Sequence, residues 1–287
     1  MSAAAPSVAA DTVGGVPEGD SVHRLAARLR PALDGRVVVD GELRGGGAAG
    51  ARLHGWRVLG HDTHGKHLLT RFDAEGSRLT LHSHLLMQGS WTVTAPGRRI
   101  PARLAPDVRV RMRTDEGTTA WGLEVPVLEL LDTRDEGRVV GHLGPDPLRD
   151  DWDAAEATRR LLTAGDRPLV AALLDQRLMS GLGNLWVNEV AYLRGLWPWT
   201  PVAEVADLEA LVATAARALR ASATVPGLYQ TTTGVTRRGE RHWVAGRAGR
   251  PCLRCGTRVE VRAELRGDPE QRRTWWCPVC QPRPRTR

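Results

Sequence analysis

The residues with the clearest chemical meaning are four cysteines near the C-terminus, arranged as two C-x-x-C pairs. The pairs are Cys252 with Cys255 and Cys277 with Cys280, and the chain has no other cysteine. Four thiolates in this pattern close a tetrahedral site that suits one Zn²⁺ ion and leaves no open position for a substrate. We therefore predict a structural zinc site, with an iron–sulfur centre or disulfides as the alternatives.

The segment between the two pairs predicts a β-hairpin, formed by residues 258–262 and 273–276. Arginines crowd this small module, at Arg250, Arg254, Arg258, Arg262, Arg266, Arg272 and Arg273. A zinc hairpin that only stabilises the fold needs no such positive charge, whereas a hairpin that contacts phosphates or a DNA groove does need it. The composition of the hairpin therefore favours a phosphate-bearing partner.

A second chemically suggestive sequence is Pro17-Glu18-Gly19-Asp20. Inside a chain the nitrogen of Pro17 is a tertiary amide without nucleophilicity, but at a free chain end it is a secondary amine. Because an α-amino group has a pKa of about 7.7–8.0 against about 10.4 for lysine, far more of it is neutral at pH 7. Its attack on a sugar C1′ would give an iminium ion, which is an electron sink for β-elimination. Glu18 could serve as the general acid/base that opens the sugar ring.

This chemistry requires that residues 1–16 do not block the amine of Pro17. These residues are small, rich in alanine and glycine, and uncharged except for Asp11, which is typical of a disordered or mis-annotated extension. We interpret Val16 as the true start, because a GUG initiation codon is read as methionine and removal of that methionine exposes Pro17. Proteolytic trimming and a retained, amine-blocking extension are the alternatives.

Residues 180–184, Ser-Gly-Leu-Gly-Asn, predict a tight double turn between two helices. Glycine lets backbone approach a bulky group closely, Asn184 is expected to cap the second helix, and free amide groups at a helix start bind anions. Gly183 and Asn184 are therefore candidate phosphate-binding residues, with an ordinary helix corner as the alternative.

The elements that must position these sites follow from the apolar pattern. Helical spacing predicts helices over 21–33, 152–163, 169–178, 184–193 and 205–222. Short β-rich runs separated by Gly, Asp and Pro predict an antiparallel sandwich or barrel, with strands near 36–39, 68–72, 78–82, 90–93, 108–112 and 125–128. The predicted fold class is multidomain α+β: an N-terminal antiparallel β-sandwich with a leading helix, a helical domain and a C-terminal zinc hairpin.

Charge and composition narrow the class of partner. The 287-residue chain has a formal net charge of +7, and Lys66 is its only lysine. A basic balance favours a phosphate-rich partner, with a merely basic protein as the alternative. The chain has no apolar run of about 18 residues or more and no signal-peptide pattern. Because paired metal-binding cysteines indicate a reducing compartment, we expect a cytoplasmic protein without membrane contacts.

Two histidines, His82 and His84, lie two apart on a predicted strand and so share a face. No further ligand is evident from the sequence, so packing or a phosphate contact is favoured over a second metal site.

Taken together, these residues resemble the formamidopyrimidine-DNA glycosylase and endonuclease VIII family from Pro17 to Gln281. The matching segments are 17–20, 65–68, 84–89, 142–148, 174–184 with 188–189, and 272–281. The resemblance implies a catalytic β-sandwich domain at 17–135, a helix–two-turns–helix DNA-binding domain at 145–240 and a zinc finger at 246–283.

The resemblance also implies roles for single residues. Pro17, Glu18, Lys66 and Arg272 would be catalytic. Lys66, Gly183, Asn184, Arg272 and Arg273 would hold the DNA, and Met87 would fill the gap left by a flipped-out base. Glu189 would hydrogen-bond near the proline amine. The zinc loop is longer than usual for the family, with Gly267-Asp268-Pro269 at its expected tip.

The implied activity is that of a bifunctional DNA glycosylase and AP lyase of base excision repair. It would act as a monomer on damaged DNA, carry one structural Zn²⁺ and associate with the bacterial nucleoid. The opening Pro-Glu-Gly-Asp and the Arg-His-Trp at 241–243 look closest to the actinobacterial endonuclease VIII branch, which prefers oxidised pyrimidines and cleaves by β,δ-elimination. The alternatives are an oxidised-purine glycosylase of the same family, or a non-catalytic zinc-containing damaged-DNA-binding protein whose proline amine is blocked.

Overall fold

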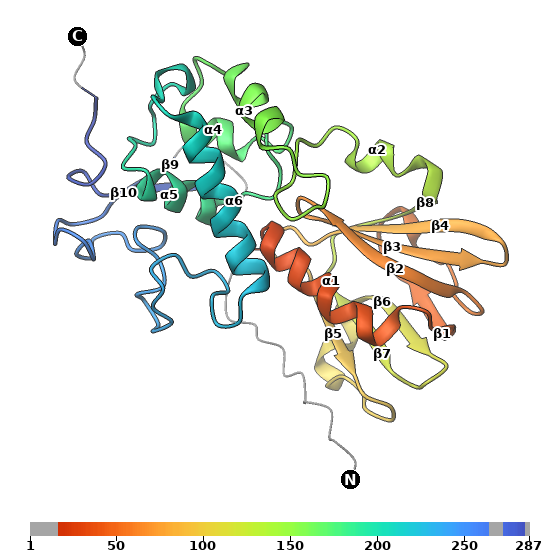
Figure 1. Ribbon diagram of the computed structural model, residues 1–287. Coiled ribbons are helices and arrows are strands. Elements are labelled where there is room, and N and C mark those ends of the chain that lie inside the picture. The colour runs from red at the N-terminus through yellow and green to blue at the C-terminus, as the bar shows by residue number, and fades with distance from the viewer. Residues whose placement is uncertain (1–16, 264–271, 285–287) are drawn as a thin grey trace. The chain divides into compact units, whose positions relative to one another are not determined.

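The computed structural model describes residues 17–263 and 272–284 (Figure 1). It contains two compact units: an N-terminal unit of Pro17 and residues 22–141, and a C-terminal unit of residues 18–21 and 142–284. The extension at 1–16 and the loop tip at 267–269, for which the sequence makes predictions, lie outside the described residues. Among the helices described, none is both long and apolar enough to cross a bilayer.

Two antiparallel four-stranded sheets and helix α1 (Gly19–Leu33) enclose the core of the N-terminal unit. The sheet orders are β1-β6-β7-β5 and β2-β3-β4-β8. The strands are β1 (Val38–Leu43), β2 (Arg57–His64), β3 (His67–Ala74), β4 (Ser77–His84), β5 (Ser90–Thr94), β6 (Val108–Thr114), β7 (Thr119–Leu123) and β8 (Val127–Asp132). One apolar cluster joins Met112 and Phe72, from different sheets, with Leu29 of α1, which makes this unit a β-sandwich with a leading helix.

Side-chain alternation determines which face of each sheet is buried. In β6, Val110 and Met112 point into the core, whereas Arg111 and Arg113 lie on the opposite face. This sheet therefore has one apolar face and one that carries arginines.

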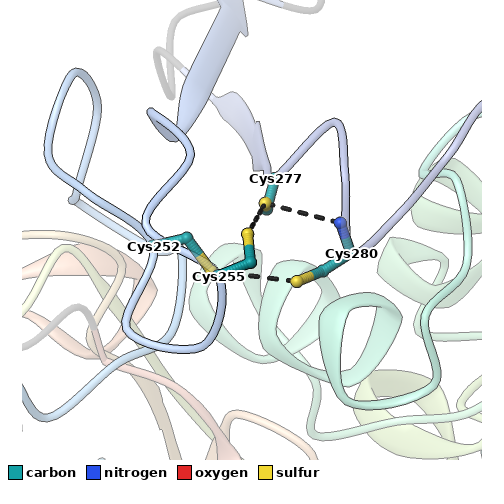
Figure 2. A group of neighbouring side chains, drawn as sticks. All are labelled: Cys252, Cys255, Cys277 and Cys280. Carbon is teal, nitrogen blue, oxygen red and sulfur yellow. Dashed lines mark hydrogen bonds between the residues drawn. The ribbon is translucent and has the colours of Figure 1, made fainter.

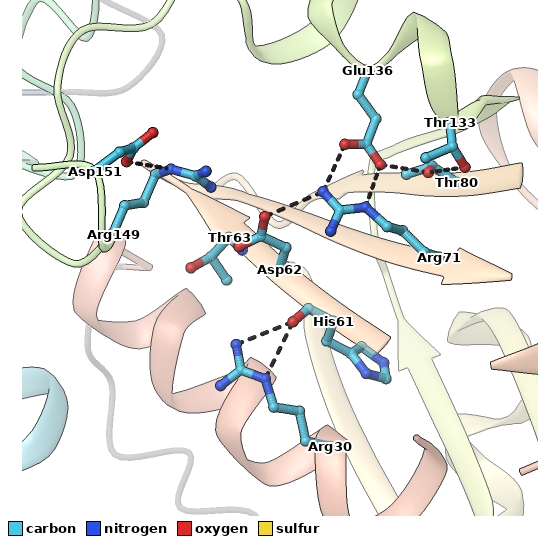
Figure 3. A network of polar contacts seen from close by, with 10 residues as sticks. All are labelled: Arg30, His61, Asp62, Thr63, Arg71, Thr80, Thr133, Glu136, Arg149 and Asp151. Carbon is cyan, nitrogen blue, oxygen red and sulfur yellow. Dashed lines mark hydrogen bonds and ion pairs between the residues drawn. The ribbon is translucent and has the colours of Figure 1, made fainter. Parts of the chain in front are cut away.

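A network of polar contacts ties the second sheet to the turn before α2 (Gly137–Val140). Arg71 on β3 donates to both oxygens of Glu136 at 2.7 Å and also to Asp62 at 3.2 Å (Figure 3). Thr80 donates to Glu136 at 2.6 Å. Burial raises the pKa of Glu136, but the hydrogen bonds from Arg71 and Thr80 outweigh it and hold that pKa below its usual value. The network is therefore charged and fixes β2, β3 and β4 together.

The C-terminal unit is helical and ends in a two-stranded hairpin. Its elements are α3 (Ala154–Leu162), α4 (Leu169–Leu174), α5 (Asn184–Leu193), α6 (Leu208–Thr224), β9 (Glu260–Ala263) and β10 (Arg273–Trp276). Asp153 and Asp207 cap α3 and α6 by accepting backbone N–H bonds of 2.9 and 2.8 Å. Helix α5 is buried from Leu185 to Tyr192, so it forms the centre of this unit.

The predicted fold class is confirmed, and the helix predicted over 184–193 has these bounds. The helix predicted to reach residue 178 ends at Leu174, because Asp175 has extended backbone, with φ −74° and ψ 102°. Strands β2 and β7 were not predicted, because β2 is mostly polar beyond Val58 and Leu59 and because Gly122 interrupts the short apolar run of β7. Both pair with neighbours on the chain, which supply the hydrogen bonds that define them.

Candidate functional site

The four predicted metal ligands meet at one point of the C-terminal unit (Figure 2). Their sulfur atoms all lie within 4.8 Å of one another, with Cys252 and Cys280 separated by 3.9 Å and Cys255 and Cys277 by 3.4 Å. Zn–S bonds of about 2.3 Å in a tetrahedron require sulfur–sulfur distances of about 3.8 Å. The cysteines are free rather than disulfide-bonded, and their geometry fits a metal ion.

Helix α5 supports this cluster through Tyr192. Its hydroxyl lies 3.1 Å from Sγ of Cys252 and 3.7 Å from Sγ of Cys280, and burial together with these sulfurs raises the pKa of Tyr192. The hydroxyl therefore stays protonated and can donate to thiolates, as residues behind metal ligands do. The ring stacks on Trp243 at 5.3 Å, and the guanidinium of Arg254 lies 4.8 Å above it.

The opposite end of α5 holds Glu18. This side chain is fully buried, and its carboxylate accepts backbone N–H bonds from Gly183 at 2.9 Å, Leu185 at 2.8 Å and Trp186 at 3.4 Å. A carboxylate at a helix N-terminus satisfies otherwise unpaired donors and interacts favourably with the helix dipole. Glu18 is therefore the capping group of α5, supplied by a segment distant in sequence. The expectation that Asn184 caps this helix is wrong, because the cap residue is Gly183 and it makes no side-chain cap bond.

Glycines make this contact possible. A Cβ on Gly183 would lie 2.5 Å from Cδ of Glu18, and a Cβ on Gly19 would lie 2.7 Å from Cα of Gly181. The N–H of Gly19 donates to the carbonyl of Gly181 at 2.9 Å, and Gly181 has a φ of +93°. The close approach expected of the Ser-Gly-Leu-Gly turn is therefore made to the segment that carries Glu18. Gly183 already donates its N–H to that carboxylate, and its contact with DNA stays a prediction.

A second buried carboxylate, Asp20, anchors the same turn. It accepts from the hydroxyl of Ser222 and from the N–H of Ser21, and Ser21 in turn lies 2.9 Å from the hydroxyl of Tyr229. Burial raises the pKa of Asp20 despite these hydrogen bonds. Residues 18–21 are thus bound to α5 and α6 through two adjacent acidic side chains.

Two asparagines of α5 form hydrogen bonds with strand β10, which begins at Arg273. Asn184 donates to the carbonyl of Arg273 at 3.1 Å, and Asn188 accepts the N–H of Trp275 at 2.9 Å. The structure therefore brings together Glu18, Gly183, Asn184 and Arg273 of the predicted residues, with Arg272 directly before β10. In the sequence, Asn188 stands out only because it lies in a segment that resembles the family.

The carboxylate of Glu189 has four hydrogen-bond donors within the C-terminal unit, and its expected bond near the proline amine stays a prediction. Its buried carboxylate accepts N–H bonds of 2.8 Å from Trp243, Val244 and Ala245, and the hydroxyl of Thr232 also donates to it. It therefore fixes the segment that leads into the cysteine module.

The remaining candidates, Lys66 and Met87, lie on turns of the N-terminal unit. Gly65 and Lys66 form the two-residue turn between β2 and β3, and Gly65 has a φ of +57°, which glycine favours. Met87 is 54% exposed beside Leu86, which is 42% exposed and has a φ of +47°. Two exposed apolar side chains on a strained turn are typical of a contact made with a partner.

Three histidines lie behind the Met87 turn. His84 accepts the N–H of Leu86 at 3.1 Å, and His67 packs on both His82 and His84, with a nitrogen–nitrogen distance of 2.7 Å to His82. Burial, together with Lys66 and His82, lowers the pKa of His84 to about 4. Among the described residues, the four cysteines are the one group of three or more ligands found able to hold a metal ion, and packing or a phosphate contact stays the interpretation of the histidines.

Comparison with known proteins gives matches over both units. The formamidopyrimidine-DNA glycosylase N-terminal domain matches residues 16–139, and the H2TH domain of the same glycosylase matches residues 143–231. A probable endonuclease 8 2 of Streptomyces coelicolor is 46% identical, over 95% of this chain and 96% of its own length. The DNA-(apurinic or apyrimidinic site) lyase Nei2 of Mycolicibacterium smegmatis is 39% identical, over 93% of this chain and 99% of its own.

Solved structures agree in fold. MutM (Fpg) of Thermus thermophilus has a TM-score of 0.71 at 28% identity, over 92% of this chain and 98% of its own. Lactococcus lactis Fpg in complex with DNA containing N7-benzyl-Fapy-dG has a TM-score of 0.74 at 22% identity, over 93% of this chain and all of its own. Another complex of that Fpg holds DNA with an oxidised pyrimidine.

Proposed function

The chain belongs to the formamidopyrimidine-DNA glycosylase family, and we propose that it excises oxidised pyrimidines from DNA through an iminium intermediate on Pro17. Its endonuclease 8 and AP lyase relatives support the broader statement that it is a DNA glycosylase and AP lyase of base excision repair. We propose that the protein acts as a monomer on nucleoid DNA in the bacterial cytoplasm.

The observation that carries the proposal is the placement of Glu18. Three backbone N–H groups at the start of α5 hold its carboxylate, and one peptide bond separates it from Pro17. A nucleophile must be held within a few tenths of an ångström to be effective. Anchoring the neighbouring side chain inside the helix–two-turns–helix core supports that requirement.

In the proposed reaction the amine of Pro17 forms a bond to C1′ of the lesion nucleotide as the bond from C1′ to the base breaks, and the base leaves with a proton. The carboxylate of Glu18 then relays a proton from solvent to O4′, and this ring opening gives the iminium ion. Loss of a C2′ proton then expels the 3′ phosphate, and a second elimination expels the 5′ phosphate. Hydrolysis of the remaining adduct frees Pro17.

The other predicted residues hold the substrate. Lys66, Asn184 and Arg272 would contact phosphates, with Arg273 adjacent, and Met87 would enter the stack beside the extruded nucleotide. Cys252, Cys255, Cys277 and Cys280 would hold Zn²⁺, which supplies folding energy to the hairpin rather than chemistry. The hydrogen bonds that Asn184 and Asn188 form with β10 would transmit that support to the arginines.

The amine is tested by comparing three proteins: one whose initiator methionine directly precedes Pro17, the same protein with Pro17→Gly, and the 287-residue chain with residues 1–16 retained. Each is incubated with a duplex containing an abasic site and borohydride, and the adduct is located by mass spectrometry. We expect a covalent adduct on Pro17 in the first protein only. An equal yield from the retained, blocked chain would disprove the mechanism, and DNA binding without any adduct would identify the non-catalytic alternative.

Lesion choice is tested separately with duplexes carrying one thymine glycol or one 8-oxoguanine. The sequence features of the endonuclease VIII branch and the endonuclease 8 relatives support faster incision at the pyrimidine. Faster incision at the purine would assign the enzyme to the oxidised-purine alternative.

A further inference from the structure

A hollow of about 900 Å³ lies on the β1-β6-β7-β5 sheet of the N-terminal unit. The strands supply Asp40, Arg111, Arg113, Thr119 and Trp121, and the segment between β5 and β6 supplies residues 97–100, Ala102 and Ala105. Register places Asp40 beside Arg113 and Arg113 beside Thr119, while Arg111 lies beside Trp121. These residues occupy the sheet face opposite to the core residues Val110 and Met112.

The hollow carries excess positive charge. Arg111 makes two bonds to Asp40, of 2.9 and 3.0 Å, and a third contact of 3.2 Å to Glu42, which also binds Arg44. These two carboxylates face five arginines, since Arg98, Arg99 and Arg113 also line the site. Arg98 and Arg99 are exposed and have no carboxylate partner within residues 17–263 and 272–284. Guanidinium groups in this number suit a phosphate group, which they bind in a bidentate manner.

The hollow also offers an aromatic and apolar surface. The indole N–H of Trp121 donates to Oγ1 of Thr94 at 3.0 Å, which fixes the ring on the sheet. Ile100 and Val108 line the same space. A fixed indole beside arginines is how proteins bind a nucleobase and its phosphate together, and the volume lies in the range of small-ligand sites.

We propose that this hollow binds a nucleotide, with its phosphate on Arg98, Arg99 and Arg113 and its base against Trp121. Lys66 and Met87, the DNA contacts proposed for the N-terminal unit, lie on turns that do not line this hollow. The nucleotide could be free or could be the end of a DNA strand, since both present the same chemistry. The site would make the β-sandwich a second point of nucleic-acid contact beyond the catalytic one.

The test uses the full chain and charge-reversal variants. Arg98→Glu with Arg99→Glu removes the unpaired cations, whereas Arg103→Glu changes an exposed arginine of the same segment that does not line the hollow. Binding of dAMP, of deoxyribose 5-phosphate and of a 5′-phosphorylated strand of about six nucleotides is measured by calorimetry. We expect the double variant to weaken dAMP binding about tenfold or more and Arg103→Glu to leave it unchanged.

Trp121→Leu tests recognition of the base. It should bring the affinity for dAMP down to that for deoxyribose 5-phosphate, and both arginine variants should incise a short lesion duplex at the wild-type rate. A strand end is identified if Arg98→Glu with Arg99→Glu weakens binding of the six-nucleotide strand as well as that of dAMP, and a free nucleotide is identified if only dAMP binding weakens. Equal binding of dAMP by all variants would overturn the proposal. So would capture of an oligoglutamate peptide, but not of dAMP, through Arg98 and Arg99.

Discussion

The exchange Glu18→Gln should destabilise the C-terminal unit as well as abolish catalysis. The carboxylate places Oε2 against the N–H groups of Gly183 and Trp186 and Oε1 against that of Leu185. A glutamine amide offers one acceptor oxygen, so in its better orientation it keeps the first two bonds and turns its NH₂ group toward the N–H of Leu185. One charge-assisted bond is lost and two donors are left facing each other in a buried site.

The magnitude follows from these contacts. Losing a hydrogen bond to a charged group costs about 1.5–3 kcal/mol, and leaving a buried donor unpaired costs about 1–3 kcal/mol. Loss of the charge at the helix start adds about 0.3–1 kcal/mol. Allowing for relaxation, we expect a loss of about 3 kcal/mol, which for a unit of this size lowers Tm by about 10 °C.

The assay is calorimetric unfolding in zinc-containing buffer, combined with hydrogen exchange of the peptide spanning α5. The control is Asp20→Asn, an adjacent and equally buried carboxylate whose pKa burial raises, so that a neutral side chain is better tolerated there. We expect that control to cost about 1 kcal/mol. If Glu18→Gln leaves Tm within about 2 °C of the wild type, or if Asp20→Asn is the more damaging change, the capping role assigned to Glu18 is refuted.

Three further predictions address the same architecture. Gly183→Ala should reproduce the loss of stability without changing Glu18, because its Cβ would lie 2.5 Å from Cδ of that residue; unchanged Tm would contradict this. His84→Asn keeps an acceptor for the N–H of Leu86 but cannot titrate. Since the pKa of His84 is about 4 when folded and about 6.5 when unfolded, its contribution is full above pH 6.5 and is lost as the pH falls toward 4. Between pH 7.5 and 5 the wild type should therefore lose about 1–2 kcal/mol more than His84→Asn in urea unfolding, and equal losses would count against a half-buried ring that stays neutral. Cys277→Ser, like a chelator, should release the metal and weaken DNA binding at least about tenfold; zinc analysis beside fluorescence anisotropy checks both, and full binding by metal-free protein would show that the hairpin folds without it.

The parts predicted correctly from sequence are those fixed by local rules. Two cysteines with two residues between them can both bind one metal ion whatever the surrounding fold, and the structure brings the four sulfur atoms within 4.8 Å of one another. Helix α5 was predicted with its observed bounds, because residues 184–193 form an apolar run long enough for a helix and the glycine directly before them marks where it starts.

What the sequence did not predict depends on contacts between distant residues. Nothing local to Asn184 indicates that a carboxylate from residue 18 caps the helix, and so the cap was assigned to Asn184 itself. The partners of Glu189 also come from Thr232 and residues 243–245 rather than from its own helix. His67 meets His82 and His84 only because β3 and β4 pair in one particular register.

Through these contacts, α5 positions three other parts of the C-terminal unit. Its first turn holds Glu18, its middle holds β10 through Asn188, and its last turn holds the cysteine cluster through Tyr192. A buried helix rises about 1.5 Å per residue and deforms little, so it fixes the spacing of the three attachments. The segment next to the proposed nucleophile, the strand that follows Arg272 and the metal module are therefore positioned by one element. In the proposed mechanism, a metal ion held by these cysteines would take no part in the reaction, and α5 would link it to the segment beside the nucleophile.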